Sequence, residues 1–176
     1  DYISVPIVIK NTNKDLDFPY LDHGFAIVDI ISGSVIKKYS IVDILKNNNF
    51  IGLLFGVGEF EYDRVHLNDA ELIAETDKYF NKGDVMLSSK HLSTVFVFRP
   101  SSGAIIWLKT GPWLNQHDID YQGNGIFTIY GNDTFRYGEV DSYDVFLTTN
   151  NIYMYDFSND LIKKQFLESL KNIKTP

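Results

Sequence analysis

Cysteine is absent from this 176-residue chain, which excludes disulfides, thiolate catalysis and cysteine-ligated zinc or iron–sulfur centres. No run of about 18 or more apolar residues occurs, so no segment is expected to cross a membrane as a helix. Basic residues are the minority, 16 against 23 acidic residues, and the net charge is −7. Because no basic patch with interleaved aromatic residues is present, nucleic acid is not an expected partner.

Familiar catalytic and cofactor motifs are missing as well. The chain has no G-x-S-x-G, G-x-x-x-x-G-K-[ST], H-E-x-x-H or G-x-G-x-x-G sequence. The acidic and amide residues of 131–144 lack the regular spacing of a calcium loop. The sequence therefore predicts neither a metal ion nor a cofactor.

Aromatic and β-branched residues, in contrast, are plentiful. The 11 tyrosines and 13 phenylalanines, together with frequent Val and Ile, favour strands over helices. The length suits one domain, residues 1–176, because chains of about 150 residues bury roughly 68–70% of their unfolded surface. The chain begins at Asp1 and ends in N-I-K-T-P, so we expect it to be a segment of a longer protein.

Short apolar runs separated by turn residues recur along the whole chain. The expected strands are residues 3–10, 23–30, 34–41, 69–74, 85–90, 94–98, 104–109, 119–121, 125–130 and 152–157, with a further one at 145–149. Residues 42–48 have the pattern of a short helix or helical turn.

The last stretch of the chain has an apolar stripe at helical spacing, formed by Leu161, Ile162, Phe166, Leu170 and Ile173. Ser158 or Asn159 would supply the N-cap. This stripe predicts a C-terminal helix packed on the edge of the sheet, and a helix that binds a partner is the alternative.

The clearest repeating unit spans residues 66–110. Four short antiparallel strands within about 41 residues match one β-propeller blade, which is typically about 40–50 residues long. A similar unit starts at His117, with a histidine and acidic residues again at the strand start. The predicted fold is therefore all-β, a partial β-propeller ring of about three to four blades plus the C-terminal helix. A β-sandwich and a mixed α+β domain are alternatives that give no reason for the repeat.

Two of the histidines, His66 and His117, are candidates for chemistry. Each stands at the start of an expected strand, and acidic residues follow at Asp69, Asp118 and Asp120. A carboxylate or carbonyl bonded to one ring nitrogen fixes the tautomer and leaves the other nitrogen free as nucleophile, base or donor. The alternative is that these polar residues only satisfy backbone groups at the strand starts.

Four further residues are candidate binding groups. Lys90 and His91 follow one another at the end of an expected strand, where alternation lets only one of them face a shared site. Lys90 would bind sulfate, phosphate or carboxylate as a point charge, or would be a solvated strand-end lysine. Trp113 would line an aromatic pocket or lie in the core, and Asn68 is an amide beside the first strand-start histidine.

Three other residues have the pattern of structural positions. His23 opens an expected strand, where a surface or turn-stabilising role is predicted. Trp107 alternates with apolar residues in a strand and is predicted to lie in the core. Arg99 is expected to be a structural turn residue.

An ordered series of motifs runs through the middle of the chain: H-L-N-D (66–69), G-D-V-M-L-S-S-K-H-L-S (83–93), P-S-S-G-A-I-I-W (100–107), Q-H-D (116–118) and G-x-x-x-x-Y-G-N (125–132). In this series the chain resembles the arylsulfotransferase-like β-propeller proteins of bacteria. The resemblance spans roughly residues 23–175 and is strongest from 65 to 132.

The resemblance implies a six-bladed propeller with a histidine-lined site at its axis. It also implies transfer of a sulfuryl group from an aromatic sulfate donor to a phenolic acceptor, without a nucleotide sulfate donor. In the mechanism that the resemblance implies, a histidine attacks sulfur and is transiently sulfated, while other histidines and an arginine bind the sulfate oxygens. Carried over, His117 is the expected nucleophile and His66 the sulfate binder or acid–base partner. The resemblance further implies a periplasmic or membrane-anchored protein outside the cytoplasm.

One position departs from the resemblance. Many relatives have arginine where this chain has Lys90, and lysine keeps the charge but loses the two-pronged fork that suits an oxyanion. Weaker sulfate binding, or a different reaction, is therefore expected. A competing hypothesis is a non-catalytic propeller that binds a ligand or partner on its rim, which Lys90 and the long polar loop 131–151 favour. In that case His66 and His117 would lie far apart, or the backbone would bind their ring nitrogens, whereas a shared site requires the imidazoles within about 8–10 Å.

Overall fold

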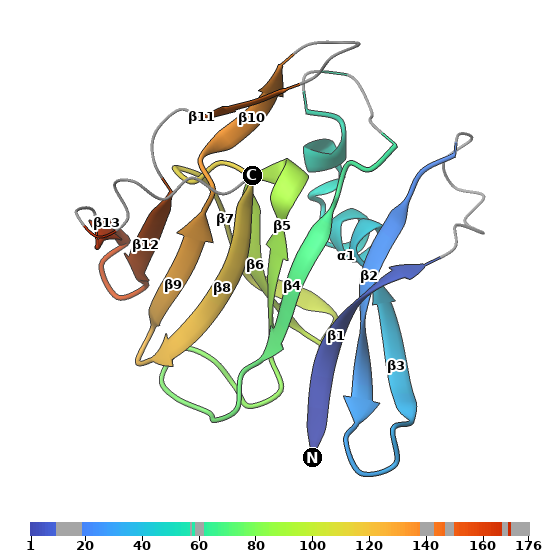
Figure 1. Cartoon of the computed structure of the whole chain (residues 1–176). Helices are drawn as coiled ribbons and strands as arrows, with labels where there is room; N and C mark the ends of the chain where they lie inside the picture. Colours follow the sequence, from blue (N-terminus) through green and yellow to red (C-terminus); the bar gives the residue numbers. More distant parts are fainter. Residues whose placement is uncertain are drawn as a thin grey trace.

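A computed structural model describes residues 1–9, 19–56, 58, 62–137, 143–146, 150–166 and 169, and of residues 135–137 and 143–146 only the backbone. The described part is mostly β (Figure 1). Its strands are β1 (Tyr2–Ile9), β2 (Asp22–Asp29), β3 (Val35–Ser40), β4 (Leu67–Leu72), β5 (Val85–Ser89), β6 (Thr94–Arg99), β7 (Ala104–Thr110), β8 (Gln116–Gly123), β9 (Ile126–Gly131), β10 (Thr134–Tyr137), β11 (Tyr143–Phe146), β12 (Asn151–Asp156) and β13 (Leu161–Gln165). Its helical elements are α1 (Ile41–Asn47) and the two 3₁₀ turns η1 (Ile51–Leu54) and η2 (Lys90–Leu92).

The strands form three main antiparallel sheets and one small hairpin. The first sheet has the order β1-β2-β3, the second β4-β5-β6-β7 and the third β13-β12-β9-β8. The hairpin β10-β11 is inserted between the paired strands β9 and β12. The four strands expected between residues 66 and 110 form one four-stranded antiparallel sheet, with ends close to those expected from the apolar runs and turn residues.

The expected C-terminal helix is wrong for its first residues, 161–165, which form a strand. Leu161–Gln165 form β13, which pairs with β12 from Asp156↔Leu161 to Ile152↔Gln165. The edge of β12 offers backbone donors and acceptors to this segment, and Ile162 packs against a buried core. These long-range interactions outweigh a helical stripe whose local propensity is weak. Of the remainder of the predicted helix, residues 167–173, only Ser169 is described, and its backbone is helical.

The one α-helix of the described residues lies near the N-terminus, where residues 42–48 predict a helical turn. Its N-cap is Ser40, whose hydroxyl accepts a hydrogen bond of 3.1 Å from the backbone N–H of Asp43. The helix buries Ile41, Val42, Ile44 and Leu45 against the first sheet. Among the described residues, no helix has the length and apolar character needed to cross a membrane.

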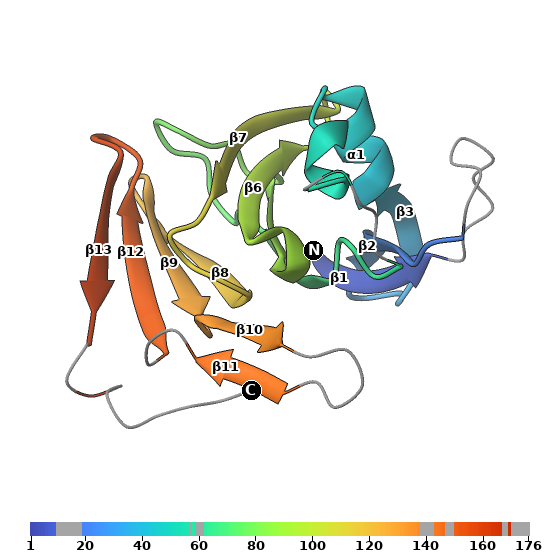
Figure 2. The same cartoon turned by 90° about the horizontal axis from the view of Figure 1, so that it is seen from above.

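The second sheet lies between two hydrophobic cores. Side chains alternate across it, so that Leu87 and Phe96 belong to the first core while Met86 and Val97 belong to the second. The first core is completed by α1 and β2, and the second by β8, β9 and β12. Figure 2 shows β6 and β7 between α1 on one side and β8 and β9 on the other. Because both of its faces are covered, β5 consists of buried residues from end to end.

Side chains of β4 and β1 also join neighbouring sheets. The hydroxyl of Ser4 in β1 donates to the carbonyl oxygen of Ala70 in β4 at 2.8 Å. On the other side of β4, Asp69 accepts a hydrogen bond of 3.2 Å from the backbone N–H of Ile119 in β8. The first strands of the three sheets therefore lie side by side, β4 between β1 and β8.

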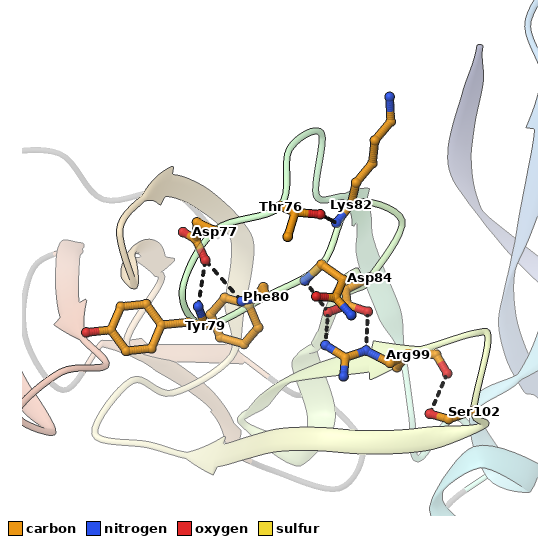
Figure 3. Close-up of polar contacts among 9 residues, drawn as sticks. Thr76, Asp77, Tyr79, Phe80, Lys82, Asp84, Arg99 and Ser102 are labelled. Carbon is orange, nitrogen blue, oxygen red and sulfur yellow. Dashed lines mark hydrogen bonds and ion pairs between the residues drawn. The ribbon is translucent and has the colours of Figure 1, made fainter.

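The turn between β4 and β5 is held by two carboxylates (Figure 3). Asp77 accepts from the backbone N–H groups of Tyr79 at 2.8 Å and Phe80 at 3.0 Å. Asp84 is bound by both prongs of the Arg99 guanidinium at 2.8 and 2.7 Å. This two-pronged ion pair joins the start of β5 to the end of β6 and confirms Arg99 as a structural residue.

Candidate functional site

The sheet topology gathers the candidate residues at one end of the sheets. His66 immediately precedes β4, and His117 is the second residue of β8. Since β5 runs antiparallel to β4, its end returns to the same place, where Lys90 begins η2. The backbone N–H of Lys90 donates to the carbonyl oxygen of His66 at 3.0 Å. The start of β4 lies at the upper end of Figure 1.

A β-bulge occurs at the start of both β4 and β8. In β4, Leu67 pairs with Ser89 and Asp69 with Ser88, so that Asn68 is the extra residue. In β8, Gln116 pairs with Gly131 and Asp118 with Tyr130, so that His117 is the extra residue. A bulge breaks the alternation and re-aims the side chain that occupies it, and such bulges are frequent beside active sites. The two units therefore repeat a backbone feature as well as a histidine.

Asp63 is the centre of the site, although the sequence analysis did not select it. Its carboxylate accepts a hydrogen bond from Nδ1 of His66 at 2.6 Å, and its other oxygen lies 2.8 Å from Nε2 of His23. Its backbone carbonyl accepts from Nδ1 of His91 at 2.6 Å. We refer to His23, Asp63, His66 and His91 as the histidine cluster. The only sequence signal for Asp63 is its position three residues before His66 in the same turn.

The imidazole rings of the histidine cluster lie against one another. The ring centroids of His66 and His91 are 4.3 Å apart, and those of His23 and His66 are 5.7 Å apart. His23 is therefore part of the cluster, and the surface or turn role expected from the sequence is wrong, because its side chain is buried and 8% of the residue is exposed. His66 has a positive φ of 43°, a left-handed conformation that non-glycine residues rarely adopt and that often marks functional positions.

The charges of this cluster shift the pKa values of its members. Burial raises the pKa of Asp63, but the hydrogen bond from His66 and the positive charges of the histidines outweigh burial, and the net pKa lies below its ordinary value. The pKa of His66 is lowered by burial and by the charges of His91 and Lys90, against the opposing effect of Asp63. His66 is therefore neutral at neutral pH, with its proton on Nδ1 and a lone pair on Nε2.

His117 has a different environment. Its side chain is exposed, and within the described part of the chain no hydrogen bond to its ring nitrogens is formed. Its pKa is lowered by partial burial and by the charges of Lys90 and His66. The pKa of His117 therefore depends on the charges of both Lys90 and His66. A neutral imidazole with unengaged nitrogens is the form of histidine that acts as a nucleophile.

Two neighbouring amides position these histidines. Asn68 donates from Nδ2 to the backbone carbonyl of Gln116 at 2.8 Å, which ties the two bulges together. Gln116 is fully buried and donates from Nε2 toward Ser89 O at 3.0 Å and Thr94 O at 3.1 Å. Asn68 therefore contacts the backbone beside His117, a contact that its spacing from His66 did not predict.

Trp113 is buried in the second core. It is 1% exposed, its indole N–H donates to the carbonyl of Ser93 at 3.0 Å, and its ring packs edge-on against Tyr153. Of the two interpretations that the sequence left open, the structure supports the core position. Trp107 also packs in the second core, where it stacks on Phe127 as expected for a core residue.

The acidic residues after the histidines do not contact their rings in the described structure. Asp69, which the sequence suggested as a partner of His66, instead accepts from the backbone of β8. Burial, followed by the charges of Asp118 and Glu71, raises its pKa to about 7 despite that hydrogen bond. Burial also raises the pKa of Glu71 and of Asp120. These carboxyls belong to the contact between β4 and β8, and Asp63 takes the role expected of them.

The site thus combines an unengaged imidazole, a lysine and three imidazoles around one carboxylate. Such a group of cationic and nucleophilic side chains suits an anionic substrate. A family model described as Arylsulfotransferase (ASST) matches residues 5–175. The chain belongs to the arylsulfotransferase family. A comparison with curated proteins gives no match. For this arylsulfotransferase family member, aryl sulfates are the general class of substrate that membership implies, and sulfate is an anion of the kind the site suits.

Proposed function

We propose that this site transfers a sulfuryl group from an aryl sulfate to a phenolic acceptor through a covalent intermediate on His117. The observation that carries the proposal is the environment of His117. Its imidazole is largely exposed and makes no hydrogen bond within the described structure. Partial burial and the charges of Lys90 and His66 lower its pKa, so the ring is neutral at neutral pH. Family membership supplies the chemical class of the donor.

In the first step, a ring nitrogen of His117 attacks the sulfur atom of the donor. The N–S bond forms with the lone pair of the imidazole, and the S–O bond to the aryl group breaks, so that a phenolate leaves with the electron pair. The Nζ of Lys90 offers a positive charge to the sulfate oxygens during this step. In the second step, the hydroxyl oxygen of the acceptor phenol attacks the same sulfur, the N–S bond breaks, and the proton of that hydroxyl must be removed.

His66 takes one of two roles in this proposal, as a sulfate binder or as the acid–base partner. Its Nδ1 donates to Asp63 at 2.6 Å, so in the neutral ring Nε2 carries the lone pair. An Asp–His pair of this kind accepts a proton from an attacking hydroxyl in many acyl- and group-transfer enzymes. When protonated, the same Nε2 would donate to a sulfate oxygen.

We also propose that the three sheets are successive blades of a β-propeller, which in this family would have six. Each sheet is an antiparallel meander apart from the inserted hairpin, and the first strands β1, β4 and β8 lie side by side. The site residues then lie at the ends of the strands nearest the axis. A crystal structure of the intact protein with its sheets arranged around an axis would bear out this arrangement, and a face-to-face sandwich would contradict it.

The test of the function uses the intact purified protein and para-nitrophenyl sulfate. Without an acceptor, we expect a burst of one phenolate per active site and a mass increase of one SO₃ group on the peptide that contains His117. Adding a phenol should discharge that adduct and form the aryl sulfate of the acceptor. His117→Ala should abolish both burst and adduct and lower turnover by at least about a thousandfold.

Asp120→Asn is the matched control, because Asp120 lies on the same strand and its side chain is exposed. This variant should keep the burst and change turnover less than about threefold. Equal turnover in His117→Ala and the wild-type protein would refute His117 as nucleophile. Absence of any turnover or adduct in the wild-type protein, across a panel of aryl sulfates, would instead favour the non-catalytic binding function.

A further inference from the structure

We propose that His23, Asp63 and His66 bind a divalent transition-metal ion. One potential ligand atom from each of these residues lies within 4.8 Å of the other two. The three residues come from two distant places in the chain, since His23 is in β2 and the other two precede β4. The spacing of these residues in the sequence gave no indication of such a site.

The distances within this group are compatible with ligands of one ion. Nε2 of His23 and Nδ1 of His66 lie 2.8 and 2.6 Å from the two carboxylate oxygens of Asp63. Tetrahedral ligands at about 2.0–2.1 Å from zinc lie roughly 3.3 Å from one another. Separating the first pair by about 0.5 Å and the second by about 0.7 Å would therefore admit the ion. In doing so, the metal would replace the proton between Nδ1 of His66 and Asp63.

A second observation points independently to a ligand. His23 is 8% exposed, and its Nε2 is buried without a hydrogen bond of acceptable geometry in the described part of the chain. The neighbouring oxygen of Asp63, Oδ1, is also buried without such a hydrogen bond. The two atoms are close but poorly aligned, so their contact does not satisfy either. Buried polar atoms are rarely left unpaired, and a metal ion would take a lone pair from both.

The donor set restricts the kind of metal. Two imidazoles and one carboxylate without thiolate suit zinc, cobalt, nickel or copper, whereas calcium and magnesium prefer oxygen ligands alone. Three protein ligands leave a fourth position open, as in catalytic zinc sites. His91 is held on the backbone carbonyl of Asp63 and orients that ligand from outside the coordination sphere.

The metal ion would also compensate for having a lysine at position 90, where many relatives have arginine. This part of the inference rests on the proposed function. A lysine offers a point charge where an arginine would clamp two sulfate oxygens. A divalent ion with one open position would bind a sulfuryl oxygen next to that lysine and so supply the missing interaction. His66 would then act on sulfate as a metal ligand rather than as an acid–base group, and His117 would remain the nucleophile.

The experiment measures metal binding directly. The intact protein is treated with a chelator, dialysed, and titrated with Co²⁺ while its visible absorption is recorded, and metal content is measured after reloading with Zn²⁺. We expect one equivalent of either ion and the visible bands of four- or five-coordinate cobalt. His23→Gln and Asp63→Asn, which preserve side-chain volume closely, should each weaken Co²⁺ binding by at least about a hundredfold.

The control variant is His117→Ala, which should keep the cobalt spectrum and affinity while losing the sulfated adduct. Circular dichroism checks that the ligand variants remain folded. The inference is overturned if the folded wild-type protein binds no Co²⁺, or if His23→Gln and Asp63→Asn bind it as tightly as the wild type does. Neither result bears on whether His117 becomes sulfated. The failure of the metal site and the failure of the proposed function are therefore distinguishable.

Discussion

One carboxylate organises most of the site at the scale of single residues. Asp63 contacts His23 and His66 through its side chain and His91 through its backbone. These contacts lower the pKa of Asp63 and keep a negative charge among the imidazoles. Such a charge would support either the acid–base role of His66 or the binding of a cation, and the cobalt titration separates the two.

Asp69 leads to a prediction about pH. Its pKa in the folded protein is about 7 against an ordinary value of 3.8, chiefly because of burial, with Asp118 and Glu71 adding to the shift. A raised pKa means that ionisation opposes folding, so the contribution of Asp69 to stability is favourable near pH 4 and is lost as pH rises through 7. Asp69→Asn keeps an acceptor for the N–H of Ile119 but removes this charge.

We therefore expect Asp69→Asn to raise the free energy of unfolding by about 1–2 kcal/mol at pH 8 and to leave it nearly unchanged at pH 4. The gain is smaller than the whole pKa shift implies, because the side chain is partly exposed to solvent. Urea unfolding of both proteins at a series of pH values measures it. A difference that is constant with pH, or greatest in acid, would contradict the prediction.

At the scale of elements, the close packing of β2 depends on a glycine. A Cβ at Gly24 would overlap the carbonyl oxygen of Tyr39 in β3, and would lie 2.6 Å from Cδ1 of Ile9 in β1. The strand is central in its sheet, so neither neighbour is free to move without breaking ladder hydrogen bonds. Gly24 follows His23, and this close approach also fixes where His23 enters the histidine cluster.

We expect Gly24→Ala to lower the free energy of unfolding by about 2–3 kcal/mol, because the contact is with backbone. Gly33→Ala is the matched control in the turn between β2 and β3. That position has a φ of 68° and open space around it, so only conformational strain of roughly 1 kcal/mol is expected. Chemical denaturation of the two variants compares them, and an equal loss in both would show that crowding at Gly24 is unimportant.

At the scale of the whole molecule, the second sheet couples the two hydrophobic cores. Its two faces belong to different cores, with Phe96 on one side and Val97 on the other. Both tryptophans lie in the second core. The first core contains α1, whose Leu45 is fully buried. Loss of packing on one face of the shared sheet therefore affects the other face.

We predict that Leu45→Ala lowers stability by about 3 kcal/mol and that tryptophan fluorescence reports this loss in full. The urea midpoints from fluorescence and from far-ultraviolet circular dichroism should coincide in the wild type and move together in the variant. A fluorescence midpoint that stays in place while the circular dichroism midpoint falls would show that the two cores unfold independently.

Much of the fold follows from local pattern. The strands around Leu87 and Phe96 were predictable from apolar runs between turn residues, and the short helix after Ser40 from the residue pattern of 42–48. The C-terminal strand was not, because Ile162 and Phe166 also suit one helical face, and only pairing with β12 decides between the two. His66 and Lys90 meet because β4 and β5 are antiparallel neighbours, whereas His23 of β2 joins them through its contact with Asp63.

The sequence by itself determined the β-rich composition, the absence of thiol chemistry, the repeating strand units and the two strand-start histidines. Each of these depends on residue type or on side-chain alternation over a few neighbouring positions. The tertiary structure alone decided that Asp63 is the partner of His66, that His23 lies against His66 and that Trp113 is buried in the second core. These relations join side chains from separate elements, and they arise from sheet pairing and packing, for which spacing along the chain carries no signal.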